Sequence, residues 1–152
     1  MLMTWVKEWN DIIRDVSYPD EEIKRLMLVP EGTGIIEFVD RYFVRAGYTS
    51  TLLTNENVRI VYGNVAAEDT DVPNVKKNEM SFDIYVKQEH AHNASRDRLE
   101  MRQELIANRL PYLLTKNRYL GGYRFWIKGQ YDLGTKTIGY TRYNISFYYM
   151  KV

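Results

Sequence analysis

Residues 81–114 constrain the fold more than any other stretch, because their apolar pattern changes from a strand period to a helix period. Residues 81–87 alternate with a period of two, which indicates a strand with one buried face. The inward set of that strand is Phe82, Ile84 and Val86. From Ser95 onward the apolar residues recur at helical spacing and form a wide stripe. Its members are Leu99, Leu105, Ile106, Leu110, Leu113 and Leu114. A helix of this kind needs a sheet to cover, so we expect further strands on both sides of it.

The flanking sequence supplies these strands and two or more helices. Apolar spacing predicts helices over 4–16 and 21–27, the second capped by Asp20, and strands over 58–62, 123–128 and about 138–151. Residues 35–44 fit a helix and a strand equally well. Pro111 predicts a kink or break near 108–110, and residues 132–136 have turn chemistry.

These elements predict an α+β fold with a mainly antiparallel four-stranded sheet, and with a long helix and N-terminal helices packed on one face. At 152 residues we expect a single domain. It comprises an N-terminal helical segment, 1–30, and an α+β core, 31–152.

Composition excludes several classes of protein. Cysteine is absent, which removes disulfides, thiolate metal sites and cysteine nucleophiles. Charge at Lys7 and Glu8 argues against a signal peptide. No apolar run approaches membrane-spanning length, so a cytosolic protein is the default expectation.

The charge is unevenly distributed along the chain. Residues 1–60 carry 7 Lys/Arg against 10 Asp/Glu, whereas residues 61–152 carry 14 against 10. Two regions of opposite sign would suit head-to-tail contact between subunits. Ordinary surface charge explains the numbers equally well.

Aromatic residues are abundant, with 13 Tyr, 3 Trp and 5 Phe. Strand alternation places several of them opposite the core set, on the second face of the sheet. These outward residues are Tyr85, Trp126, Tyr148 and Met150. Tyrosine and tryptophan favour interfaces, although strands also favour them. We predict a contact surface for copies of the chain or other partners.

Residues 63–79 read as a long polar connection that includes Glu68, Asp69 and Asp71. Such loops are uncommon in compact domains and often functional. One interpretation is an arm that orders against a neighbouring subunit; the alternative is a solvated acidic loop. The spacing of an EF-hand is missing.

No catalytic motif is present, so we predict neither enzymatic activity nor a cofactor. His90 and His92 are the only histidines, and they lack a third metal ligand at suitable spacing. Residues 96–128 are basic, holding Arg96, Arg98, Arg102, Arg109, Lys116, Arg118, Arg124 and Lys128. A solvated helix face is one interpretation. The other is a non-specific DNA contact through phosphates, with Arg96, Arg98, Arg102 and Arg109 facing the nucleic acid.

Four phrases of the sequence resemble a known family. They are Leu-Leu-Thr-Asn-Glu-Asn-Val-Arg-Ile-Val-Tyr (52–62), Phe-Asp-Ile-Tyr-Val-Lys (82–87), Asn-Ala-Ser-Arg-Asp-Arg-Leu (93–99) and Gly-Tyr-Thr-Arg-Tyr-Asn-Ile-Ser-Phe-Tyr-Tyr (139–149). With the strand–helix–hairpin layout, they resemble the tail-terminator or tail-completion proteins at the neck of long-tailed bacteriophages and prophages. The resemblance covers residues 35–152.

The resemblance implies a structural protein of the virion without catalytic residues. Its members form rings, commonly hexameric, that terminate the tail tube and join it to the head connector. The implied partners are copies of the chain, the tail tube protein and head–tail connector proteins, and the implied locations are the virion neck and, during assembly, the host cytoplasm. The alternative from residue chemistry is a small nucleic-acid-binding module using the basic residues of 96–128.

Overall fold

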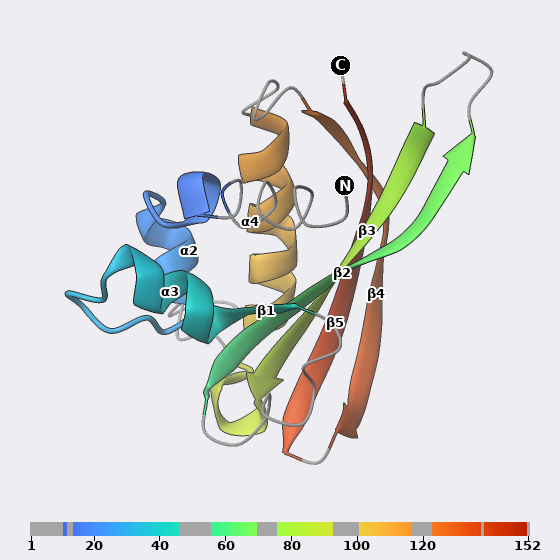
Figure 1. Cartoon of the computed structure of the whole chain (residues 1–152). Coiled ribbons are helices and arrows are strands. Elements are labelled where there is room, and N and C mark those ends of the chain that lie inside the picture. Colours follow the sequence, from blue (N-terminus) through green and yellow to red (C-terminus); the bar gives the residue numbers. More distant parts are fainter. Residues whose placement is uncertain are drawn as a thin grey trace.

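A computed structural model shows an α+β fold in which helices cover one face of a twisted five-stranded sheet (Figure 1). It describes residues 11, 14–45, 56–69, 76–92, 101–116, 123–137 and 139–151. The strand order is β1-β2-β3-β5-β4, so β1 and β4 are the two outer strands of the sheet.

The four long strands pair in antiparallel fashion. They are β2 (Val58–Asp69), β3 (Lys76–Lys87), β4 (Tyr123–Thr137) and β5 (Tyr140–Lys151). The short strand β1 (Phe43–Arg45) pairs in parallel with Ile60–Tyr62 of β2, placing Phe43 opposite Ile60. The sheet is therefore mixed and five-stranded, and the prediction of four mainly antiparallel strands was too simple.

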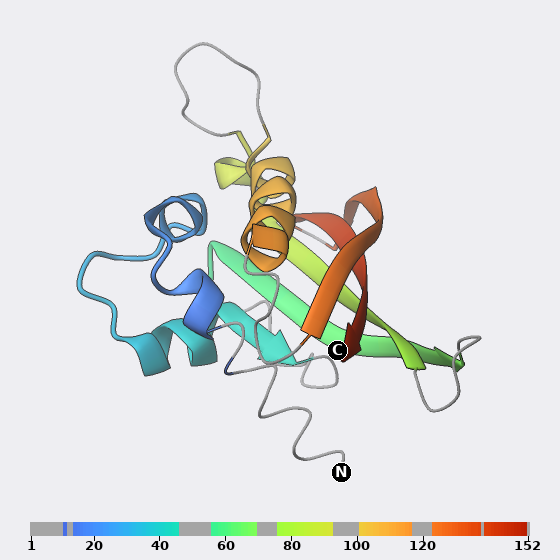
Figure 2. The ribbon, with the colours of Figure 1, turned by 90° about the horizontal axis from the view of Figure 1, so that it is seen from above.

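Three helices lie together on one side of the sheet, as the view from above shows (Figure 2). They are α2 (Glu21–Leu26), α3 (Ile35–Tyr42) and α4 (Arg102–Lys116), and a 3₁₀ turn, η2 (Gln88–His90), follows β3. Helix α4 packs on β3, β4 and β5, whereas α2 packs on α4 and α3 on β1 and β2. Residues 14–17 are also helical, while the rest of the predicted 4–16 helix, except residue 11, lies outside the described residues.

The predicted core forms between α4 and the sheet. The inward residues of β3 are at most 1% exposed, and they meet Ile106 and Leu110 of α4. Phe147 of β5 packs edge-on against Phe82 at 5.6 Å between ring centroids. Asp20 caps α2 as predicted, because its Oδ2 accepts a hydrogen bond of 2.9 Å from the Ile23 amide.

The ambiguous stretch 35–44 contains both kinds of structure. Residues Ile35–Tyr42 form α3, in which Phe38 and Tyr42 are buried. The chain then enters β1 directly at Phe43. The sequence fits both a helical and a strand pattern because the stretch contains a helix followed by a strand.

The predicted long loop over 63–79 is wrong for most of its length. Strand β2 continues to Asp69 and β3 begins at Lys76, so the two strands form a hairpin that projects beyond the body of the sheet (Figure 1). The register places Glu68 opposite Lys77 and Asp69 opposite Lys76. The polar composition of these residues had suggested a loop and not a pair of strands.

The turn predicted at 132–136 is also wrong. These residues belong to β4, which continues to Thr137, and β5 begins at Tyr140, directly after Gly139 with its φ of +82°. Register shifts occur in β4 between Ile127 and Gly129 and between Asp132 and Gly134. Glycine at these points signals bulges rather than the end of the hairpin.

Helix α4 differs from its prediction at its first residue and at Pro111. It begins at Arg102, because Met101 forms a β-bridge with His92, and residues 93–100 lie outside the described part. It also continues through Pro111 to Lys116, so the second of the two predicted outcomes, a break, does not occur within Arg102–Lys116. Pro111 is buried there.

Candidate interaction surface

The predicted aromatic residues lie on the face of the sheet opposite the helices, but in two groups. Trp126 of β4 is paired with Tyr148 of β5, and their rings lie 5.8 Å apart. Met150 follows on β5, opposite Arg124. Tyr85 lies further along the sheet, opposite Arg142. All four predicted interface residues are half-buried, and they do not form one continuous patch.

A polar network separates the two groups. Asp83 binds Arg142 at 2.7 Å and accepts a hydrogen bond of 2.7 Å from Asn144 Nδ2, which also bonds to Ser81. Ser146 donates to Asn144 Oδ1 at 3.0 Å. Several polar groups in the middle of this face are therefore paired within the chain, although the buried Nε of Arg142 has no partner among the described residues. Burial is the largest influence and by itself lowers the pKa of Arg142, but the hydrogen bond to Asp83, the charge of Asp83 and the nearby Tyr85 together outweigh it and raise that pKa.

Cations cover both aromatic groups. The Lys77 Nζ lies 4.1 Å from the centroid of the Tyr148 ring, and Lys128 Nζ lies 5.6 Å from it. Lys128 also pairs with Glu79 at 2.9 Å. Arg142 lies 5.6 Å from the centre of the Tyr85 ring, where burial raises the pKa of the phenol. Contacts of this kind stabilise a cation over a ring, so the surface is more polar than strand alternation alone predicted.

A groove of about 980 Å³ lies where the end of α4 meets the start of β4. Its lining combines aromatic, apolar and basic side chains: Tyr112, Leu114, Thr115, Lys116, Arg124, Phe125, Trp126 and Met150. Tyr112 is 48% exposed. We call this the α4–β4 groove. It connects two of the predicted interface residues, Trp126 and Met150, to the helix side of the molecule.

A second exposed apolar feature lies on α3, and the sequence did not single it out. Ile36 is 74% exposed and Ile35 is 37% exposed. Glu37 and Asp40 flank them on the same helix and are also exposed. We call these four residues the α3 knob. Spacing had placed Ile35 in a helical pattern together with residues that are buried, and only the fold reveals which side faces solvent.

Two of the four arginines predicted to face DNA point into the helix layer instead. Arg102 is only 6% exposed, and it donates hydrogen bonds to the backbone carbonyls of His90 (2.8 Å) and Leu26 (2.9 Å). Burial lowers its pKa, although an arginine stays protonated. The prediction that Arg102 lies on an outer face is therefore wrong. Arg96 and Arg98 lie outside the described residues.

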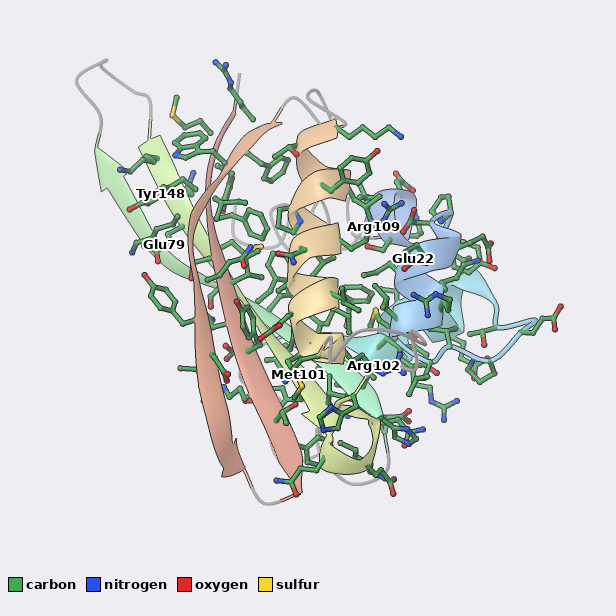
Figure 3. All side chains as sticks on the ribbon, turned by 180° about the vertical axis from the view of Figure 1, so that it is seen from behind. Glu22, Glu79, Met101, Arg102, Arg109 and Tyr148 are labelled. Carbon is green, nitrogen blue, oxygen red and sulfur yellow. The ribbon has the colours of Figure 1, made fainter. Side chains whose placement is uncertain are left out.

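Arg109 pairs with the carboxylate that caps α2. Its Nη2 and Nε bind Asp20 at 2.5 and 2.9 Å, a two-point contact between helices far apart in sequence. Figure 3 shows Arg102 and Arg109 on the side of α4 toward α2, and Tyr148 and Glu79 on the far side of the sheet. The hydrogen bond from Arg109 lowers the pKa of Asp20.

The acidic residues predicted for the interface have mixed positions. Glu68 and Asp69 lie at the end of β2, opposite the two lysines of β3, and Asp71 lies outside the described residues. His90 lies in η2, 3.5 Å from Glu89, and His92 is exposed. Across the described segments, no three His, Cys, Asp or Glu side chains gather where they would hold a metal ion.

No model of a known protein family matches this chain, and no curated protein matches it either. Within the ranges given above, no helix is both long enough and apolar enough to cross a membrane.

Proposed function

We propose that this chain is a structural subunit of an oligomeric ring at the neck of a long-tailed bacteriophage, where it terminates the tail tube and joins it to the head connector. The sequence resemblance suggests the location. The observation that carries the structural part is the asymmetry of the sheet: α2, α3 and α4 cover one face, and the other holds Tyr85, Trp126 and Tyr148, half-buried. Large aromatic side chains with a polar tip are enriched at protein interfaces.

The two outer strands lie at opposite edges of the sheet and present different surfaces. A contact between unlike surfaces is heterologous, and it closes into a ring when the rotation between neighbours permits. This supports a ring of identical subunits and is consistent with the uneven charge of the two parts of the sequence.

Light scattering coupled to size exclusion, followed by negative-stain imaging, tests the proposal directly. We expect a closed ring, or binding of the chain to purified tail tubes. A strict monomer at the highest attainable concentration, with no affinity for tail tubes, would contradict it.

A nucleic-acid-binding module is the second candidate, and the α4–β4 groove is the feature that favours it. Lys116 and Arg124 lie there beside Tyr112 and Trp126, a combination that suits stacked bases and a phosphate backbone. The inward positions of Arg102 and Arg109 weaken this candidate, because they remove two of its expected phosphate contacts. Its test is affinity for single-stranded DNA that falls steeply with salt.

A further inference from the structure

We infer that the α4–β4 groove of one copy receives the α3 knob of a second copy. This contact rests on the proposed function and specifies how its ring is made. Two exposed features of opposite character carry the inference, one at each edge of the sheet.

The knob presents apolar side chains that the fold leaves in water. Helix α3 buries Phe38 and Tyr42 on one side, while Ile36 remains 74% exposed on the other. Asp40, one helical turn beyond Ile36, lies on the same face. Removing an isoleucine from water is favourable in proportion to the apolar area covered, so this side of α3 gains from a partner.

The neighbouring arginine on α3 neutralises the negative charge of the knob only in part. Arg41 follows Asp40 on α3, but its Nε binds Glu56 at 2.7 Å, and its contact with Glu37 is longer, at 3.5 Å. Glu37 and Asp40 therefore give this side of the helix a formal charge of −2.

The groove offers the opposite character. Lys116 and Arg124 contribute a formal charge of +2, and Tyr112, Trp126 and Met150 contribute apolar walls. The Lys116 ammonium lies 5.5 Å from the centroid of the Tyr112 ring, so a positive charge lies beside an aromatic wall of the groove. A basic groove with aromatic walls fits an isoleucine flanked by carboxylates, and complementary charge fixes its orientation.

The positions of the two features make the contact heterologous. Helix α3 leads directly into β1 at one edge of the sheet, and the groove borders β4 at the other edge. A copy that donates its knob to one neighbour therefore keeps its groove free for the next. Repeated contacts of this type generate a ring or an open filament and not a closed dimer.

Charge reversal on each side tests the contact. One variant carries Glu37→Lys and Asp40→Lys, and the other carries Lys116→Glu and Arg124→Glu. We expect each variant alone to associate about a hundredfold more weakly than the wild type, since like charges are then juxtaposed at every contact. Glu89→Lys, on η2, is the matched control and should assemble as the wild type does.

Mixing the two reversed variants in equal amounts should restore assembly, because every contact between unlike variants is again complementary. Combining all four substitutions in one chain should restore it too. Recovery on mixing also shows that each variant is folded, and melting curves of the separate variants check this independently.

The outcomes separate the two proposals. Wild-type rings together with variants that assemble normally, or with a mixture that stays monomeric, would overturn this contact and leave the ring function standing. A wild type that neither forms rings nor binds tail tubes would overturn both. Single-stranded DNA binding by a monomeric wild type, abolished by Lys116→Glu and Arg124→Glu, would assign the groove to nucleic acid instead.

Discussion

Replacing Arg102 by methionine should destabilise the fold strongly, although the residue belongs to a basic cluster that looked solvent-facing. Its guanidinium is buried and is held by the backbone carbonyls of Leu26 and His90, and no carboxylate among the described residues pairs with it. Hydrogen bonds to a charged group contribute about 1.5–3 kcal/mol each. Methionine removes both bonds and leaves two carbonyl groups without donors, at about 1–3 kcal/mol each when fully buried.

Part of this loss is recovered, because the variant no longer buries a charge. We therefore expect Arg102→Met to lower the free energy of unfolding by about 2–4 kcal/mol. Urea unfolding followed by circular dichroism measures this change. With a slope of about 2 kcal/mol per molar urea, the midpoint should fall by about 1–2 M.

Arg109→Met is the matched control, on the same helix. Arg109 is 31% exposed in its side chain and binds one carboxylate at the edge of the helix layer, so its loss should cost about 1 kcal/mol. Equal stability of Arg102→Met and the wild type, within about 0.5 kcal/mol, would refute the conclusion that the buried hydrogen bonds of Arg102 stabilise the fold. Loss of DNA affinity in a fully stable Arg102→Met protein would restore the nucleic-acid interpretation.

Three further predictions follow from the contacts. The hydrogen bond from Arg109 lowers the pKa of Asp20, so the unfolded chain binds a proton at Asp20 more readily than the folded protein does. The resulting stabilisation is complete above the ordinary pKa of 3.8 and is lost as the pH falls through the lower pKa of the folded state. Asp20→Asn should therefore make the free energy of unfolding depend less on pH in the acid range. Trp126→Ala should weaken assembly measured by light scattering more than it lowers the melting temperature, and the opposite pattern would make Trp126 a folding residue. Gly139→Ala should lower the free energy of unfolding by about 1 kcal/mol, because a φ of +82° strains any side chain even in open space; an unchanged urea midpoint would contradict this.

The strand and helix of residues 81–114 were predictable because both keep one periodicity and bury one face. The same pattern located Phe82, Ile84 and Val86 in the core, where they are at most 1% exposed. Asp20 was predictable as a cap from the two glutamates that follow it. Its second role, holding Arg109 of α4, was not, because the two residues lie 89 positions apart.

The hairpin of β2 and β3 shows where composition misleads. Residues 63–79 contain few apolar side chains, so no buried face marked them as a strand. The backbone ladder between β2 and β3 continues through this stretch, and its register places Glu68 opposite Lys77. The register of the ladder is not visible in the sequence, so the stretch was predicted to be an acidic loop.

The candidate site was predicted in its parts but not in its arrangement. Alternation assigned Trp126 and Tyr148 to the outer face, and their rings do meet there. It did not reveal the cations above them, nor the groove beside them, because both depend on how α4 ends against β4. Ile36 was missed for a related reason: its exposure depends on which side of α3 meets the sheet.

The distribution of polar groups on the outer face bears on where copies associate. In the middle, Asp83 already bonds to Arg142 and Asn144, so a partner placed there would displace water and gain few bonds from these groups. Covering Trp126 and Met150 removes little hydration of polar groups, because most of the surface of these two side chains is apolar. They lie on the wall of the α4–β4 groove. The aromatic face inferred from the sequence and the charged groove found in the structure therefore converge on the same edge of the sheet, and this favours β4 over the centre of the face as the place where a second copy docks.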